Sequence, residues 1–253
     1  MRYLGLTLMA ALACACATTG TGSGTEKLST REAEQLQYQL AERLVDQRDF
    51  EHALPYLRGL LAQYPRNGRL RLMLAEVLRE KGMLEAARLE LERVQKQVPA
   101  NLEVAAAMGV LLDHMGRHGE AEPLHRRAVK GAPGSPRYHN NLGFCLFLQR
   151  RLDEAKAEFQ DAIRLDPGFR RAYNNLGFVH GLQGDRDAAL TAFSQAGSKP
   201  LALTNLGLVE EMRGQPLMAR RMYERALRAQ PGYRPALRNL RGLDTQSRTG
   251  EEE

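Results

Sequence analysis

Histidine and cysteine are the residue types in this 253-residue chain that could support metal binding or nucleophilic catalysis. His114 and His118 are four residues apart, a spacing that places two side chains on one face of a helix. Gly116 lies between them, however, and predicts a turn that separates them. Cys145 is expected to be a small buried hydrophobe. Three further histidines are expected to be packing residues: His125, His139 and His180. We therefore predict no metal site and no catalytic residues.

Phosphate and nucleic-acid chemistry are also disfavoured. The glycine-paired segment 131–136 (GAPGSP) lacks the lysine and the strand-to-helix context of a phosphate-binding loop. The formal charge of +6 is modest, and Lys and Arg alternate with Asp and Glu, which is typical of solvated helix faces. Because basic clusters with stacking aromatics are missing from the sequence, we expect neither a nucleic-acid partner nor a small-molecule substrate. The sequence predicts a protein that is not an enzyme and needs no cofactor.

The N-terminal residues predict export. Arg2 precedes an apolar run, Tyr3 to Ala13, whose 11 residues are too few for a transmembrane helix, since a span needs about 20 residues. Residues 1–13 are therefore expected to be a secretory signal.

Cys14 is a candidate for lipidation. The run from Ala11 to Cys14 (ALAC) resembles a bacterial lipobox, which implies that Cys14 carries a lipid and anchors the protein to the outer membrane on its periplasmic face. Because leucine stands two places before the cysteine and not three, an ordinary cleaved signal remains the alternative. Residues 14–33, rich in Gly, Ser and Thr, are expected to be a flexible tether.

An offset of 34 residues aligns the chain with itself and defines six units. These are residues 34–67, 68–101, 102–135, 136–169, 170–199 and 200–233. One position is alanine in every unit: Ala53, Ala87, Ala121, Ala155, Ala189 and Ala219. Another is always small: Ala41, Ala75, Gly109, Gly143, Gly177 and Gly207. Proline closes five of the units: Pro65, Pro99, Pro133, Pro167 and Pro231.

This pattern resembles the tetratricopeptide repeat family over about 200 of the 253 residues. The small residues would lie where two antiparallel helices approach most closely, and proline would end one helix before the next begins. The resemblance predicts an all-α solenoid of six helix-turn-helix repeats. Residues 234–243 are expected to form a capping helix, and 244–253 a disordered tail. The fifth unit is four residues short, about one helical turn.

In this family the first helix of each repeat lines a concave, peptide-binding groove. The resemblance implies that the following residues of units four to six face it: Arg137, Asn140, Asn141, Phe144, Phe147, Leu148, Arg171, Asn174, Asn175, Phe178, Leu182, Thr204, Asn205, Leu208 and Met212. The first two units offer a more polar wall: Tyr38, Glu42, Glu76 and Arg79. We predict that a partner peptide or helix binds units four to six, with Asn140 and Asn174 bonding its backbone. The alternative is that the aromatic residues pack between repeats and the asparagines bond internally.

An exported repeat protein of this plan resembles the pilotin-type outer-membrane lipoproteins of pilus assembly, in the tight-adherence and type IV systems alike. The resemblance implies an assembly factor whose groove holds a secretin segment or another pilus-assembly component. The alternative is a periplasmic scaffold that recruits a protease or a cell-wall hydrolase. An accessory domain of an enzyme is disfavoured, because only about 20 mature residues flank the repeats on each side.

Overall fold

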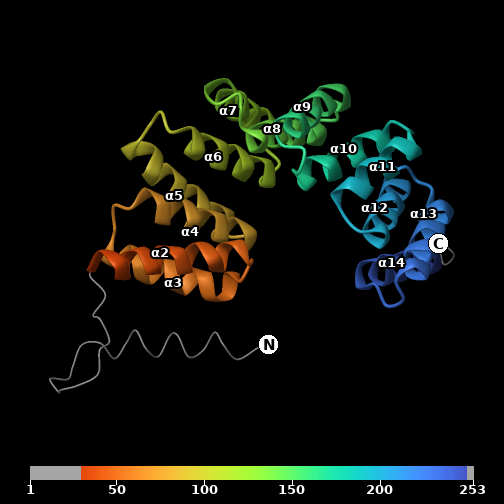
Figure 1. Ribbon diagram of the computed structural model, residues 1–253, viewed down its shortest axis with the longest axis horizontal. Coiled ribbons are helices and arrows are strands. Elements are labelled where there is room, and N and C mark those ends of the chain that lie inside the picture. The colour runs from red at the N-terminus through yellow and green to blue at the C-terminus, as the bar shows by residue number, and fades with distance from the viewer. Residues whose placement is uncertain (1–29, 250–253) are drawn as a thin grey trace, which may run out of the picture. The chain divides into compact units, whose positions relative to one another are not determined.

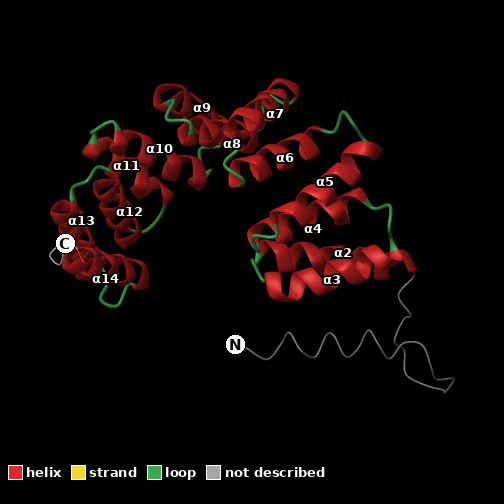
Figure 2. Ribbon diagram, turned by 180° about the vertical axis from the view of Figure 1, so that it is seen from behind, coloured by secondary structure: helices red, strands yellow, loops and turns green. Residues whose placement is uncertain are grey.

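The computed structural model describes residues 30–249, and within this range the regular structure is entirely helical (Figure 2). The predicted signal, Cys14 and nearly all of the predicted tether lie outside the described residues. The helices are α2 (Thr30–Asp46), α3 (Phe50–Gln63), α4 (Gly68–Glu80), α5 (Leu84–Gln97), α6 (Leu102–His114), α7 (His118–Gly131), α8 (Pro136–Leu148), α9 (Leu152–Leu165), α10 (Arg170–Leu182), α11 (Arg186–Ala196), α12 (Lys199–Met212), α13 (Pro216–Ala229) and α14 (Arg234–Thr249). None of these helices is both long enough and apolar enough to span a bilayer.

The chain divides into two compact units, residues 1–40 and 41–253, and the packing described here is that of the second. Each helix from α3 to α13 packs against the helix that follows it in the chain (Figure 1). The first helices of successive repeats, α4 to α12 in steps of two, also contact one another in order, and α12 contacts α14. The predicted solenoid of six helix pairs with a C-terminal capping helix is therefore confirmed.

In the fourth and fifth repeats, close approach of the two helices requires a residue without a Cβ. A Cβ at Gly143 would lie 2.8 Å from the ring of Phe159. A Cβ at Gly177 would lie 2.5 Å from the ring of Phe193. Both rings are fully buried, so each aromatic side chain fills the space that the glycine leaves open.

The second, third and fourth repeats each begin at a helix end that is capped by a side chain. The side-chain oxygens of Asn67 and Asn101 accept hydrogen bonds from the backbone N–H of Leu70 and Val104, at 3.0 and 3.1 Å. Such caps satisfy backbone donors that have no partner inside the helix. Pro65 and Pro99, two residues before these asparagines, follow the end of the second helix of the previous repeat. The residue that ends one helix and the residue that caps the next are therefore close together in the sequence.

The turn inside each repeat needs a left-handed backbone conformation. Glycine supplies it in four repeats, for example at Gly116 with φ 73° and Gly184 with φ 94°. Arginine occupies the equivalent position in the first and fourth repeats, Arg48 with φ 56° and Arg150 with φ 63°. The two arginine turns carry a strain that the glycine turns avoid.

The capping helix is longer than predicted. The sequence pattern predicted its end at residue 243, but α14 continues through Thr249. Arg220 of α13 forms an ion pair with Asp244, which ties the C-terminal half of α14 to the preceding helix. This contact depends on the tertiary structure, so helix periodicity alone does not reveal it.

Candidate functional site

Three consecutive first helices present partly exposed apolar side chains at equivalent positions. In each of α8, α10 and α12 the two positions are four residues apart, so both lie on the same face of the helix. The six residues, called here the apolar stripe, are Phe144, Leu148, Phe178, Leu182, Leu208 and Met212. Every one of them is at least partly accessible to solvent, and the most exposed are Phe144 at 38% and Met212 at 50%. These residues were predicted to face a partner, and the structure leaves them available for one.

The aromatic residues of the predicted groove divide into two kinds. Phe144 stacks on Phe147 with ring centroids 6.3 Å apart, and Phe147 in turn packs against the buried core. Phe178 meets the buried ring of Phe193 edge-on at 5.1 Å. Phe144 is thus mainly surface, whereas Phe147 and Phe178 also contribute to packing inside and between repeats. Truncating Phe178 would therefore affect stability as well as any partner.

The asparagines bond to one another across neighbouring first helices. The Asn175 side-chain N–H donates to the Asn140 side-chain oxygen at 2.9 Å. Asn205 donates to Asn174 in the same way at 2.7 Å. These bonds account for asparagine in mid-helix, where it is otherwise unfavourable. Asn140 is buried by the arrangement, so the amides left near the surface are those of Asn141, Asn174 and Asn175.

The remaining predicted groove residues are placed differently. Thr204 is buried, and its hydroxyl donates to the backbone oxygen of Pro200 at 2.7 Å. Arg137 and Arg171 are exposed in the first turns of α8 and α10. The Arg137 guanidinium lies over the ring of Tyr138, with its central carbon 5.2 Å from the ring centroid. The two arginines therefore extend the accessible surface at the N-terminal ends of the first helices.

The second repeat replaces the stripe with carboxylates. Glu76 and Glu80 of α4 occupy the positions that the stripe holds in α8. Partial burial works to raise the pKa of Glu80, but nearby Arg79 and Arg48 outweigh it and hold that pKa below its usual value. Glu80 is therefore charged at neutral pH, and an apolar partner surface would be disfavoured along α4.

A buried polar cluster between the third and fourth repeats was not predicted. Asp113, His118, His125 and Cys145 meet where α6, α7 and α8 come together. His114 and His118 lie on different helices, as expected, and His125 is a buried residue over Gly109, also as expected. The convergence of these side chains had no counterpart in the sequence pattern.

Stacked helix pairs whose first helices expose an apolar row define a helical-repeat scaffold for protein–protein interaction. Models of the tetratricopeptide repeat family match residues 44–111 and 136–169. The chain therefore carries tetratricopeptide repeats, and the resemblance found in its sequence is confirmed.

Solved structures share this fold at low sequence identity. PilW, a type IV pilus biogenesis factor, matches with a TM-score of 0.66 at 19% identity over 83% of this chain and 98% of its own. PilF of Pseudomonas aeruginosa matches at 0.59 and 20% identity, over 82% of this chain and 96% of its own. The human IFIT1 dimer with m7Gppp-AAAA matches at 0.67 and 16%, over 82% of this chain and 54% of its own. No curated protein matches the sequence. Because such different proteins share the fold, the partner must be argued from the residues of this chain.

Proposed function

We propose that this protein is an assembly factor of the pilotin type, which binds a segment of an outer-membrane secretin of a pilus system along the apolar stripe. The stripe is the observation that carries the proposal, because it offers six apolar side chains on adjacent first helices while the equivalent positions of α4 are acidic. Support for the pilus setting comes from the fold shared with PilW, a pilus biogenesis factor, and from the lipobox-like leader.

The partner surface that fits the stripe is an amphipathic helix or an extended peptide with regularly spaced apolar residues. Full burial of a Phe or Met side chain stabilises a complex by about 1.5–3 kcal/mol, and the half-buried side chains here would gain about half of that. Phe144 and Met212, the most exposed members, would together contribute about 1.5–3 kcal/mol. Their loss corresponds to a decrease in affinity of about 12- to 140-fold.

The binding test is a pull-down with the mature protein from the cells that produce it. We expect the wild type to recover a secretin subunit and the Phe144→Ala/Met212→Ala variant to lose it, with little change in melting temperature. Leu217→Ala is the matched control, because Leu217 is 73% exposed but lies on the second helix α13. It should bind like the wild type.

Two results would contradict the proposal. Recovery of a protease or cell-wall hydrolase in place of a secretin would identify the protein as a recruiting scaffold instead. Equal loss of binding in the Leu217→Ala control would show that the stripe is not the binding surface. In the proposed role the repeats act by binding alone, with the lipid anchor setting where the partner is held.

The proposed anchor has its own test. We propose that Cys14 is acylated and holds the protein at the periplasmic face of the outer membrane. Metabolic labelling with a fatty-acid analogue should label the wild type and the Cys16→Ser variant but not Cys14→Ser. Fractionation should show the same pattern, with Cys14→Ser released from the membrane. Labelling that persists in Cys14→Ser would refute the assignment of Cys14 as the lipidated residue.

A further inference from the structure

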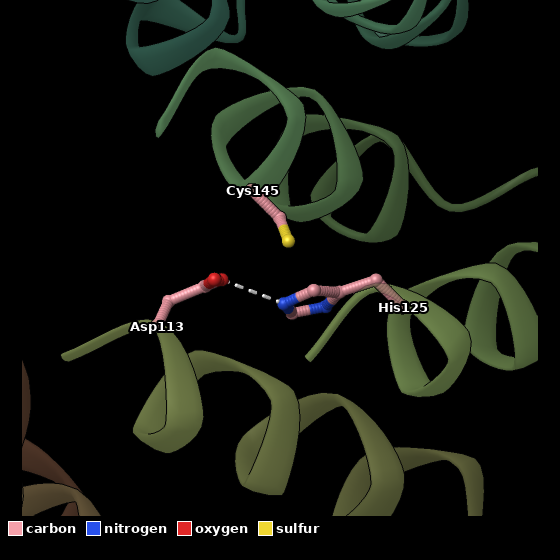
Figure 3. A group of neighbouring side chains, drawn as sticks. All are labelled: Asp113, His125 and Cys145. Carbon is pink, nitrogen blue, oxygen red and sulfur yellow. Dashed lines mark hydrogen bonds and ion pairs between the residues drawn. The ribbon is translucent and has the colours of Figure 1, made fainter. Parts of the chain in front are cut away.

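Four polar side chains from three helices converge between the third and fourth repeats. Asp113 lies in the last turn of α6, His125 in α7 and Cys145 in α8 (Figure 3), and His118 is the first residue of α7. His125 Nε2 donates to one carboxylate oxygen of Asp113 at 2.9 Å, and His118 Nδ1 donates to the other at 3.0 Å. The Cys145 sulfur points toward the carboxylate and the imidazole of His125 (Figure 3). Three residue types that bind transition metals thus face one another.

The other repeats carry mostly apolar residues at these positions. The position of His125 holds Leu57, Leu91, Phe159, Phe193 and Tyr223. The position of Cys145 holds Arg43, Val77, Leu111, Val179 and Val209. The position of His118 holds Phe50, Leu84, Leu152, Arg186 and Pro216. The fold therefore does not need histidine or cysteine at these three positions. The position of Asp113 varies more, and in the sixth repeat it holds Glu211, which accepts a hydrogen bond from Tyr223 at the position of His125.

The cluster is costly to bury as it stands. The Asp113 side chain is 3% exposed, and its ion-pair partners within residues 30–249 are the two imidazoles, which are charged only when protonated. Nδ1 of His125 is buried and has no hydrogen-bond partner among the described residues. A buried carboxylate reduces stability unless a positive charge compensates it. The unpaired Nδ1 is a separate cost, because it is not the nitrogen that a metal would bind here.

We propose that Asp113, His125 and Cys145 bind one divalent transition-metal ion of the Zn²⁺ type. Their ligand atoms all lie within 4.8 Å of one another, and the three residues are buried. Tetrahedral Zn²⁺ holds such atoms about 3.3–3.6 Å apart, given its usual bond lengths. A small contraction of the sulfur toward the Asp113–His125 pair therefore completes three of the four positions. His118 is the one member of the cluster with a partly exposed side chain.

The protons balance in this step. The Cys145 thiol loses its proton to solvent as the sulfur binds the metal. The proton on His125 Nε2 moves to Nδ1, so that the Nε2 lone pair can coordinate. One proton is thus released per ion bound, and the metal, carboxylate and thiolate charges cancel. His118 remains hydrogen-bonded to the second carboxylate oxygen and orients it, as an outer-shell residue does.

A second group, His139 with Glu158 and Asp161, fits a metal less well. Both ring nitrogens of His139 face oxygen acceptors, the Glu158 carboxylate at 2.7 Å and the Pro133 carbonyl at 3.0 Å. Both ring nitrogens of His139 therefore already have a polar partner without a metal. The bound ion at the first cluster would instead join the third repeat to the fourth, because its ligands come from α6, α7 and α8.

The test uses the full chain with Cys14 and Cys16 replaced by serine, so that Cys145 is the remaining thiol. Cobalt is the probe, because a thiolate bound to Co²⁺ gives a charge-transfer absorption in the near ultraviolet that oxygen and nitrogen ligands do not. We expect this band to saturate at one equivalent of Co²⁺ and to disappear when Zn²⁺ is added. Zn²⁺ alone should raise the melting temperature, because it binds the folded state.

Variants that restore the residues of other repeats should remove the site and keep the fold. Cys145→Val and His125→Phe should both abolish the band, and metal-free Cys145→Val, which keeps both partners of Asp113, should melt at or above the wild-type temperature. His118→Ala should weaken binding about 10- to 100-fold, the effect of losing an outer-shell partner. His114→Ala is the matched control, because His114 is exposed and outside the cluster, and it should bind like the wild type.

The outcomes that overturn the proposal are specific. Absence of the thiolate band in the wild type would exclude the site. Binding that persists in both Cys145→Val and His125→Phe would move the metal elsewhere. A band that His114→Ala removes would mean that the thiolate-bound metal depends on His114, outside the proposed ligand set. Pilus or partner assays do not enter this test, so its result is independent of the proposed function.

Discussion

Alanine substitutions at Gly59 and Gly177 distinguish the effect of helix propensity on stability from the effect of packing. Gly59 in α3 and Gly177 in α10 both lie inside helices, where replacement of glycine by alanine stabilises by about 0.5–1 kcal/mol. A Cβ at Gly59 would meet no atom within 4 Å, so Gly59→Ala should show this gain in full. A Cβ at Gly177 would lie 2.5 Å from the Phe193 ring, which is fully buried and braced by Phe178. Overpacking of this kind costs about 1–3 kcal/mol.

The two variants should therefore differ by about 1–3 kcal/mol, with Gly177→Ala the less stable. For a chain of this length that difference corresponds to roughly 2–10 °C in melting temperature. Urea unfolding followed by far-UV circular dichroism measures it. In a Phe193→Ala background the clash disappears, and Gly177→Ala should become stabilising, like Gly59→Ala. If Gly177→Ala stabilises the wild type as much as Gly59→Ala does, the close helix approach described for the repeats is wrong.

Three further predictions concern a turn, a buried ion pair and a buried phenol. Arg150→Gly should stabilise by about 0.5–1 kcal/mol, because φ is 63° there and left-handed backbone costs an arginine about 1–2 kcal/mol; a lower melting temperature would contradict this. Arg186→Met should destabilise the fold by about 2–3 kcal/mol, because it leaves a buried carboxylate without its partner. That carboxylate belongs to Glu210, which is 1% exposed and accepts a hydrogen bond from Arg186 at 2.8 Å. Adding Glu210→Gln should recover much of that loss, and no recovery would argue against the pair. Burial and the Glu211 carboxylate raise the pKa of the Tyr223 phenol in the folded protein. Its contribution to the free energy of unfolding is therefore present below about pH 10, and it falls at higher pH because the tyrosine ionises in the unfolded chain. Tyr223→Phe should therefore flatten the decline of the urea midpoint above pH 10, and parallel curves for the two proteins would exclude this cause.

The repeat architecture could be read from the sequence because each of its marks acts locally. A glycine or alanine in the first helix, together with an alanine in the second, predicts a contact between the two helices. A proline before a capping residue predicts the boundary between two repeats. The stripe residues could be placed as well, since their spacing within one helix fixes their face. The exposed fraction of each side chain could not be predicted, because Phe144 and Phe178 occupy equivalent repeat positions and differ only in the residues that pack against them.

Features that depend on neighbouring repeats were harder to anticipate. Each asparagine pair joins residues about one repeat apart in the chain. Which side-chain amide donates to which oxygen therefore depends on how neighbouring repeats stack. The cluster around Asp113 draws on three helices and has no motif spacing, although comparison of its positions across the six repeats would have marked it as unusual. The length of α14 depends on an ion pair between Arg220 and Asp244, which periodicity does not show.

The asparagine pairs also indicate where a further repeat could be added to such a chain. Asn174 accepts from the next repeat while its neighbour Asn175 donates to the previous one, so the fifth unit carries complementary groups on its two sides. A duplicate of residues 170–199 inserted behind the original would find both groups matched, by Asn174 on one side and Asn205 on the other. Lengthening the array at this point preserves every amide pair, whereas a copy of a unit lacking them would interrupt the series.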